Sequence, residues 1–341
     1  MAVVDLTEGA TVSFDTLSTK AYLLEKTIDL KNWSPASEQI DGNGSRAVVQ
    51  TSTTNSVEFF RVQVLSPFTF DHLSIDTAAD MEDLRSGFDP GNWRVTAKEV
   101  LKRTFTDAWW IVENDSDPNF FYFWFGGEMS DFTQMMYRLS AAVHETVHHV
   151  GFARISFQNG QFVHALALGE NTFFSIPEMG LFPRSEILAA LPPELQTADY
   201  ANTYLTGQSG GQDVVNLLDE FNAYTFSALV DATVVNQLTG LSGSSSRDGV
   251  LTFMLYTETY LNLARENYTA DYDKMLNSDI PDLIVLLWDR AESALAISKG
   301  DPRLGQQDAL IRTYVYEPAR LNEVERLRAR VLPRVEIEAG G

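Results

Sequence analysis

Hydrophobic and polar residues alternate over short distances in the first part of the chain. Four segments rich in β-branched and aromatic residues are separated by polar turns, and they cover residues 11–17, 21–30, 45–52 and 57–65. Asn, Gly, Ser and Pro lie between them, most clearly at Gly42–Ser45. No helix-period segment of useful length occurs in this region. The pattern predicts an all-β, sandwich-like module over residues 1–66.

The pattern changes after a linker that we place at Ser66. Apolar residues now recur at helical spacing, and helices are predicted at 131–150, near 186–192, and at 212–238, 249–266, 280–298 and 318–331. Strands are predicted in 153–158, 162–168 and 172–178, and a hairpin is predicted from 107–114 and 119–127. We therefore expect an α+β protein in which residues 67–341 form a mainly helical domain with a small β-sheet.

One predicted helix, at residues 131–150, carries most of the chain's histidines. Asp131 and Gln134 have the spacing of a capping box, and Gly151 is positioned to end the helix in a left-handed conformation. Its apolar positions are Phe132, Met135, Met136, Leu139, Val143, Val147 and Val150. His144 and His148 stand four residues apart and hence on one face of this helix, whereas His149 lies off that face.

The stretch His144-Glu145-Thr146-Val147-His148 is an HExxH motif. Imidazoles at i and i+4 can converge on one Zn²⁺ ion at bond lengths of about 2.0–2.1 Å. Zinc lowers the pKa of its bound water toward about 7, and the intervening glutamate removes a proton from that water as it attacks a carbonyl. The motif therefore predicts zinc ligands at His144 and His148 and a general base at Glu145.

Catalytic zinc commonly has a third protein ligand, and several residues compete for that role. Arg154 occupies the position at which metzincins have their third histidine, and a guanidinium has no lone pair to donate. His164 lies in a predicted strand. Glu220 lies on the amphipathic helix at 212–238, with Tyr224 one turn later. Asp219 precedes it and is a candidate to orient a zinc-bound imidazole.

Composition and charge narrow the classes of partner. The chain has 341 residues, 44% of them hydrophobic and 21% charged, as expected of a folded globular protein. A formal net charge of −22 argues against nucleic acid and against anionic membranes as partners. Cysteine is absent, so a metal site must use His and carboxylates. We predict no membrane insertion, because no apolar stretch approaches the length of a span.

Two resemblances add to this interpretation. The HExxH helix followed by Glu220-x-x-Ala223-Tyr224 resembles gluzincin metallopeptidases, in which a glutamate on a later helix is the third zinc ligand. That resemblance implies Glu220 as the ligand. The best-known gluzincins place an aspartate four residues after it, whereas this chain has Tyr224. Tyr224 is thus either a donor to the oxyanion or a packed aromatic residue, and Tyr256 and Tyr260 are rival donors.

The β-module resembles one found in bacterial exported and surface proteins. The matching segments are a strand that leads to the corner Leu30–Trp33 and a later strand containing Phe59–Val62. The resemblance implies an extracellular or cell-surface protein. The chain shows no signal-peptide pattern, so an export signal would have been removed, and a cytoplasmic location is the alternative.

We therefore expect a zinc peptidase that hydrolyses peptide or protein substrates, with the segment at 119–127 as an edge strand for the substrate. The alternatives are a non-catalytic surface or binding protein on a zincin-like scaffold, and a cytoplasmic metal hydrolase that acts on small molecules. A separation of Glu220 from the two histidines of more than about 6 Å would favour the scaffold, because zinc–carboxylate bonds measure about 2.0–2.2 Å.

Overall fold

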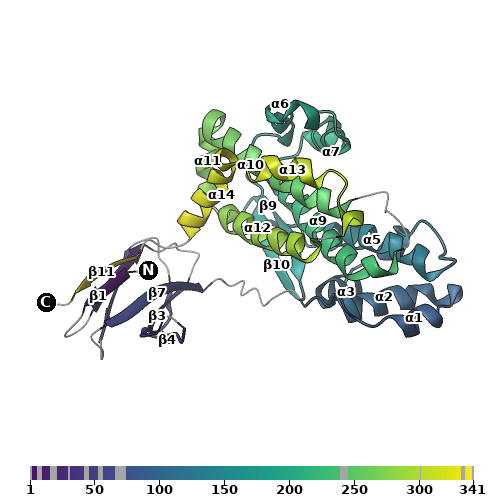
Figure 1. Ribbon diagram of the computed structural model, residues 1–341. Coiled ribbons are helices and arrows are strands. Elements are labelled where there is room, and N and C mark those ends of the chain that lie inside the picture. The colour runs from purple at the N-terminus through teal and green to yellow at the C-terminus, as the bar shows by residue number, and fades with distance from the viewer. Residues whose placement is uncertain are drawn as a thin grey trace. The chain divides into compact units, whose positions relative to one another are not determined.

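The computed structural model describes most of the chain, as two compact units (Figure 1). The described residues are 2–5, 10–15, 21–29, 31–41, 46–52, 57–65, 74–238, 245–299, 301–331 and 335–339. One unit comprises Met1–Asp71 with Glu325–Gly341, and the other comprises His72–Val324. The predicted linker from Ser66 and the predicted turn at Gly42–Ser45 lie outside the described residues.

The first unit consists of two antiparallel sheets. Its strands are β1 (Ala2–Asp5), β2 (Ala10–Asp15), β3 (Ala21–Thr27), β4 (Ser34–Pro35), β5 (Ile40–Asp41), β6 (Arg46–Thr51), β7 (Val57–Leu65) and β11 (Val335–Ala339). One sheet has the order β1-β7-β3-β4, with β5 also paired to β3, and the other has the order β11-β2-β6. The four strands predicted from the sequence correspond to β2, β3, β6 and β7.

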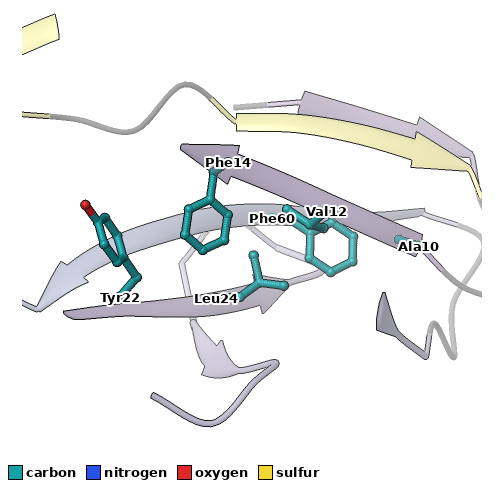
Figure 2. Close-up of a cluster of buried hydrophobic side chains, with 6 residues drawn as sticks. All are labelled: Ala10, Val12, Phe14, Tyr22, Leu24 and Phe60. Atoms are coloured by element: carbon teal, nitrogen blue, oxygen red, sulfur yellow. The ribbon is translucent and has the colours of Figure 1, made fainter. Parts of the chain in front are cut away.

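Figure 2 shows the core of this unit, to which both sheets contribute. The buried side chains are Ala10, Val12 and Phe14 from β2 and Tyr22, Leu24 and Phe60 from β3 and β7. Within β2 and β3 they are spaced two residues apart, because alternate side chains of a strand face the same side. The predicted all-β module is confirmed, and its core is shared between the two sheets as in a sandwich.

The two segments that resemble the exported-protein module contact each other in this unit. The Arg61 guanidinium lies 4.2 Å from the centroid of the Trp33 ring. Its Nε also donates to Glu25 Oε2 at 2.6 Å. A planar cation over an indole face is a favourable contact, so Arg61 and Trp33 hold the corner against β7. Leu30 is outside the described residues.

Strand β11 belongs with the N-terminal strands, although it is at the far end of the sequence. It pairs with β2 in antiparallel register, from Val335 opposite Phe14 to Ala339 opposite Ala10. No predicted element covered these residues, although Val335 to Ala339 alternate between apolar and acidic residues and are bounded by Pro333 and Gly340, which is a strand signal.

The second unit is mainly helical. Its helices are α1 (Glu82–Ser86), α2 (Trp93–Thr104), α3 (Thr106–Glu113), α4 (Phe120–Phe123), α5 (Phe132–Phe152), α6 (Ile187–Ala190), α7 (Asp199–Tyr204), α8 (Gly207–Gly210), α9 (Val214–Val234), α10 (Ser246–Asn267), α11 (Thr269–Leu276), α12 (Ile280–Ile297), α13 (Asp308–Val315) and α14 (Pro318–Val331), the last of which crosses the division between the units. Strands β8 (Ser156–Gln158), β9 (Gln161–Gly169) and β10 (Thr172–Pro177) form a sheet of order β10-β9-β8. The chain is therefore α+β, with a helical unit and small sheets as expected.

Helix α9 lies at the centre of this unit and packs against α5, α10 and α12. It begins where the Asp213 side chain accepts a hydrogen bond from Val215 N. Nearly all its side chains are buried, which is the pattern of a helix surrounded by others. Polar residues on α9 therefore face the protein interior, where they require partners.

The predicted hairpin at 107–127 is wrong. The first segment forms α3, and the second forms the short helix α4. Aromatic and β-branched residues favour strands, but packing decides short apolar segments. Here Phe125 and Tyr122 pack on the buried indole of Trp93, with ring centroids 4.7 and 5.6 Å away. The segment 119–127 is consequently no edge strand for a substrate.

The structure confirms the histidine helix and corrects its end. Asp131 caps α5 by accepting from Gln134 N at 2.8 Å, but the Gln134 side chain contacts Ser130 rather than completing the box with Asp131. Gly151 does not end the helix, which continues to Phe152. A Cβ at Gly151 would lie 2.5 Å from Ala165 O, so glycine is needed there to let β9 approach α5. Among the described residues, no helix has the length and apolar character needed to cross a bilayer.

Candidate metal centre

The centre begins with two histidines on α5. His144 and His148 are each 8% exposed, and both side chains point to the interior from one face of the helix. Their Nε2 atoms lie 3.2 Å apart. The rings are inclined at 77° with centroids 4.8 Å apart, so the two nitrogens converge while the rings do not stack.

A carboxylate from α9 completes the group. Glu220 Oε2 lies 3.5 Å from His144 Nε2 and 3.3 Å from His148 Nε2. The potential ligand atoms of all three residues lie within 4.8 Å of one another. The prediction that Glu220 joins the two histidines is therefore confirmed as geometry. The distances from Glu220 Oε2 to the two imidazole nitrogens are well below about 6 Å, the separation above which a non-catalytic scaffold would be favoured.

The spacing of the three atoms suits a tetrahedral ion. Ligand atoms of a tetrahedron are separated by about 1.6 times the bond length, so bonds of about 2.0–2.1 Å place them roughly 3.3–3.4 Å apart. The three separations here are 3.2, 3.3 and 3.5 Å. Glu220 Oε2 is also buried without a hydrogen-bond partner among the described residues. A buried carboxylate oxygen without a hydrogen-bond partner fits a site in which this oxygen and the two imidazole nitrogens would bind one cation.

Both imidazoles are oriented through their other nitrogen. His148 Nδ1 lies 2.6 Å from Asp219 Oδ2, and His144 Nδ1 lies 3.2 Å from Ser227 Oγ. Ser227 in turn donates to Ser140 O at 3.4 Å. A carboxylate at Nδ1 favours the tautomer in which Nδ1 carries the proton, so the Nε2 lone pair is free for a metal.

The charges of the group act on one another strongly. Burial by itself would raise the pKa of Glu220, but its contacts with His144 and His148 lower that pKa to about 2. Burial would lower the pKa of His148, whereas Asp219 and Glu220 raise it well above its usual value. Positive charge on His148 therefore stabilises the Glu220 carboxylate.

Glu145 and two tyrosines lie near these ligands. The hydroxyls of Tyr204 and Tyr224 are 2.8 Å apart, and the Tyr224 ring lies 4.6 Å from that of His144. Burial raises the pKa of both phenols, and the charges of Glu220 and Glu145 raise it further. Both tyrosines therefore remain protonated near neutral pH and can act as hydrogen-bond donors.

Helix α10 fixes the position of Tyr224. A Cβ on Gly249 would lie 2.1 Å from Tyr224 Cδ1, so the absence of a side chain there makes room for the ring. Phe253, one turn later, stacks on the same ring at 5.1 Å. Tyr224 is accordingly both a packed aromatic residue and a neighbour of the metal ligands. Of the two alternatives for Tyr224, the packed aromatic residue is observed, and the oxyanion donor stays a prediction.

The remaining candidates from the sequence have other partners. Tyr260 donates to Phe182 O at 2.6 Å, and His149 Nδ1 lies 2.7 Å from Asp115 Oδ1. Tyr256 is buried, at 2% exposure, and its ring contacts that of Phe253 with centroids 5.6 Å apart. Arg154 stacks on an aromatic ring of β10. His164 is not part of the group that could hold a metal ion, and it lines a crevice beside Asp219.

Sequence reasoning missed three residues of the centre. Ser227 follows Glu220 by seven residues, so the helical repeat of α9 could have identified it. Tyr204 lies on α7, and its spacing from Tyr224 gives no signal. Arg184 is 1% exposed, and its Nη1 has no hydrogen-bond partner among the described residues. Burial lowers its pKa, while the charge of Glu220 acts in the opposite direction.

Comparison with known proteins adds no family to this geometry: no family model, curated protein or solved structure matched the chain.

Proposed function

We propose that the protein is a zinc-dependent peptidase. The observation that carries the proposal is the triangle formed by the Nε2 atoms of His144 and His148 and Oε2 of Glu220, with sides of 3.2–3.5 Å. A second glutamate, Glu145, lies on α5 between His144 and His148. Metal ligands and a general base are thereby supplied by two packed helices.

The donor set favours zinc over other common ions. Two imidazole nitrogens and one carboxylate oxygen match the borderline character of Zn²⁺, whereas Mg²⁺ and Ca²⁺ favour sites built from oxygen. Three protein ligands leave a fourth tetrahedral position for water or substrate. When bound, zinc would supply Lewis acidity, polarising a carbonyl and lowering the pKa of water toward about 7.

The protein residues would then perform the proton transfers. Glu145, half-buried and adjacent to the ligands, accepts the proton of the attacking water and returns it to the leaving amine. Tyr204 and Tyr224 share one hydrogen bond, so one of their two O–H groups remains free to donate. We assign that O–H to the oxyanion that develops on the substrate carbonyl, with Tyr224 as the nearer neighbour of the ligand ring.

We further propose that the protein acts outside the cytoplasm. This proposal rests on the β-module, whose corner at Trp33 is held by Arg61 from β7. The sequence segments that carry the resemblance to exported proteins thus contact each other as parts of one folded unit.

The decisive test of the peptidase is Glu145→Gln, which removes the base and leaves the metal ligands. Proteolysis should fall by about 10²–10⁴-fold, the usual contribution of general acid–base catalysis, while zinc content stays at the wild-type level. Glu170→Gln, an exposed glutamate on the β9–β10 turn, is the matched control and should cleave like the wild type. Zinc-loaded wild type that cleaves no peptide, or a Glu145→Gln variant of undiminished activity, would overturn the proposal.

A further inference from the structure

The exposed aromatic side chains of the helical unit lie on α5 or on segments around α4 and β9, the two elements that pack against α5. Phe123 and Trp124 are 73% and 36% exposed, Phe152 is 48% exposed, and Phe157 and Phe162 are 65% and 50% exposed. They account for all the strongly exposed aromatic residues in the described part of the chain. They lie on and just after α4, at the end of α5, and on the β8–β9 hairpin. Clustered exposed aromatics mark a binding surface more often than scattered ones do.

Ring contacts link these aromatic side chains within each set, and on the α4 side they reach α5. Phe157 and Phe162 are cross-strand partners in the hairpin, with ring centroids 5.2 Å apart. On the α4 side, Trp124 contacts Phe123 at 5.6 Å and Phe120 at 6.2 Å. Phe120 stacks on His149 at 4.0 Å, and His149 directly follows the proposed ligand His148 on α5. The two elements that carry most of these side chains, α4 and β9, both pack against α5.

Phe152 lies next to the candidate metal centre. The Phe152 ring is nearly parallel to the ring of His148, with centroids 5.9 Å apart. Phe152 also lines a narrow crevice that reaches Asp219, the residue bound to His148. Ile155, His164 and Leu166 also line this crevice.

Strand β9 leads from the exposed hairpin into this crevice. Side chains two residues apart on a strand share a face, so Phe162, His164 and Leu166 form one row. Phe162 is half exposed at the hairpin, whereas Leu166 is 1% exposed and lines the crevice. The row is mostly apolar, with His164 as its one titratable member, so it suits apolar side chains.

We propose that this aromatic surface is the substrate-docking site of the peptidase and binds extended peptide segments with large apolar side chains. The inference rests on the proposed function and names its substrate class. Phe157 and Phe162 would contact the apolar side chains, and Phe152 and Ile155 would hold the segment beside the metal centre. Burying an aromatic side chain against such a surface is favourable without any fixed charge.

The test uses the full chain carrying Glu145→Gln, loaded with zinc, so that bound peptide is not cleaved. Two fluorescein-labelled twelve-residue peptides of equal charge are compared by fluorescence anisotropy, one alternating Phe with Ser and the other alternating Gly with Ser. The Phe peptide should bind at least about tenfold more tightly. Adding Phe157→Ser with Phe162→Ser should weaken its binding at least about fivefold, and Phe123→Ser with Trp124→Ser should weaken it to a similar extent.

Ile297→Ser with Leu310→Ser is the matched control, because these two exposed apolar residues lie on α12 and α13. It should leave the affinity unchanged. Equal binding of both peptides, or a hairpin variant with retained zinc content and wild-type affinity, would overturn the inference. So would a dimer in sedimentation that dissociates on hairpin substitution while neither peptide is preferred. Because binding is read without cleavage, its failure is separable from failure of the Glu145 assay.

Discussion

Two glutamates in the helical unit show what buried carboxylates do with and without partners. Glu220 on α9 is 19% exposed in its side chain and faces two imidazoles. Glu258 on α10 is fully buried, and neither of its carboxylate oxygens has a hydrogen-bond partner among the described residues. Burial disfavours a negative charge at both positions, yet the pKa of Glu220 is lowered and the pKa of Glu258 is raised.

The difference comes from the neighbours. The histidines lower the pKa of Glu220 to about 2 in spite of its burial. At Glu258 burial dominates and raises the pKa to about 9, although the charge of Arg320 opposes that rise. Arg320 directs its hydrogen bonds elsewhere, to Thr259 and Glu317 at 3.2 Å each. Burial alone therefore favours the protonated acid. A buried glutamate stays ionised, and so able to bind a cation, only when groups such as the two imidazoles lie next to it.

The largest expected effect comes from removing the charge at Glu220. Glu220→Gln keeps the shape of the side chain but replaces a carboxylate ligand with an amide, and zinc affinity should fall by more than about 100-fold. Competition with a chelating dye measures the dissociation constant. Glu258→Gln is the matched control on the neighbouring helix and should bind zinc like the wild type. Equal affinities of the two variants would remove Glu220 from the site.

A smaller effect is expected from Asp219, which touches a ligand rather than the metal. Asp219→Asn should lower zinc affinity by about 10–100-fold, because the His148 ring loses the carboxylate that fixes its tautomer. The same competition assay applies. An affinity unchanged within twofold would show that His148 is oriented by packing alone.

The smallest effect concerns the stability of the Glu258 region. A folded-state pKa of about 9 lies above the unfolded value of 4.5, so the folded state holds a proton that unfolding releases. Stability is therefore lost as pH rises through that window. At pH 8.5 unfolding of the wild type releases the Glu258 proton, whereas a glutamine at this position has no proton to release, so Glu258→Gln should be the more stable protein. The difference in the free energy of unfolding should be on the order of 1–2 kcal/mol, because the charge of Arg320 offsets part of the cost of ionising Glu258. At pH 5 the two should unfold alike in urea, and a pH-independent difference would contradict the raised pKa.

The sequence predicted those parts of the centre that follow a helical repeat. His144, Glu145 and His148 lie within one turn of α5, so their spacing alone places them together. Glu220 could be predicted only from the resemblance to the gluzincin pattern, because its contact with the histidines depends on how α9 packs on α5. Tyr204 could not be predicted, since only the tertiary fold brings α7 next to α9.

Errors arose where packing overrode local pattern. The segment at 119–127 has strand-like composition, but Trp93 provides an aromatic surface that α4 packs against as a helix. Gly151 looked like a helix end, yet its role is to admit the Ala165 carbonyl of β9. In both cases the deciding neighbour lies more than ten residues away in sequence, where periodicity carries no information.

The most direct test of the metal centre is anomalous scattering at the zinc edge from crystals of the full chain grown with zinc. The account predicts one strong peak within about 2.0–2.1 Å of the Nε2 atoms of His144 and His148 and about 2.0–2.2 Å of a Glu220 oxygen. A fully occupied zinc ion bound elsewhere, with no peak between these three residues, would contradict it.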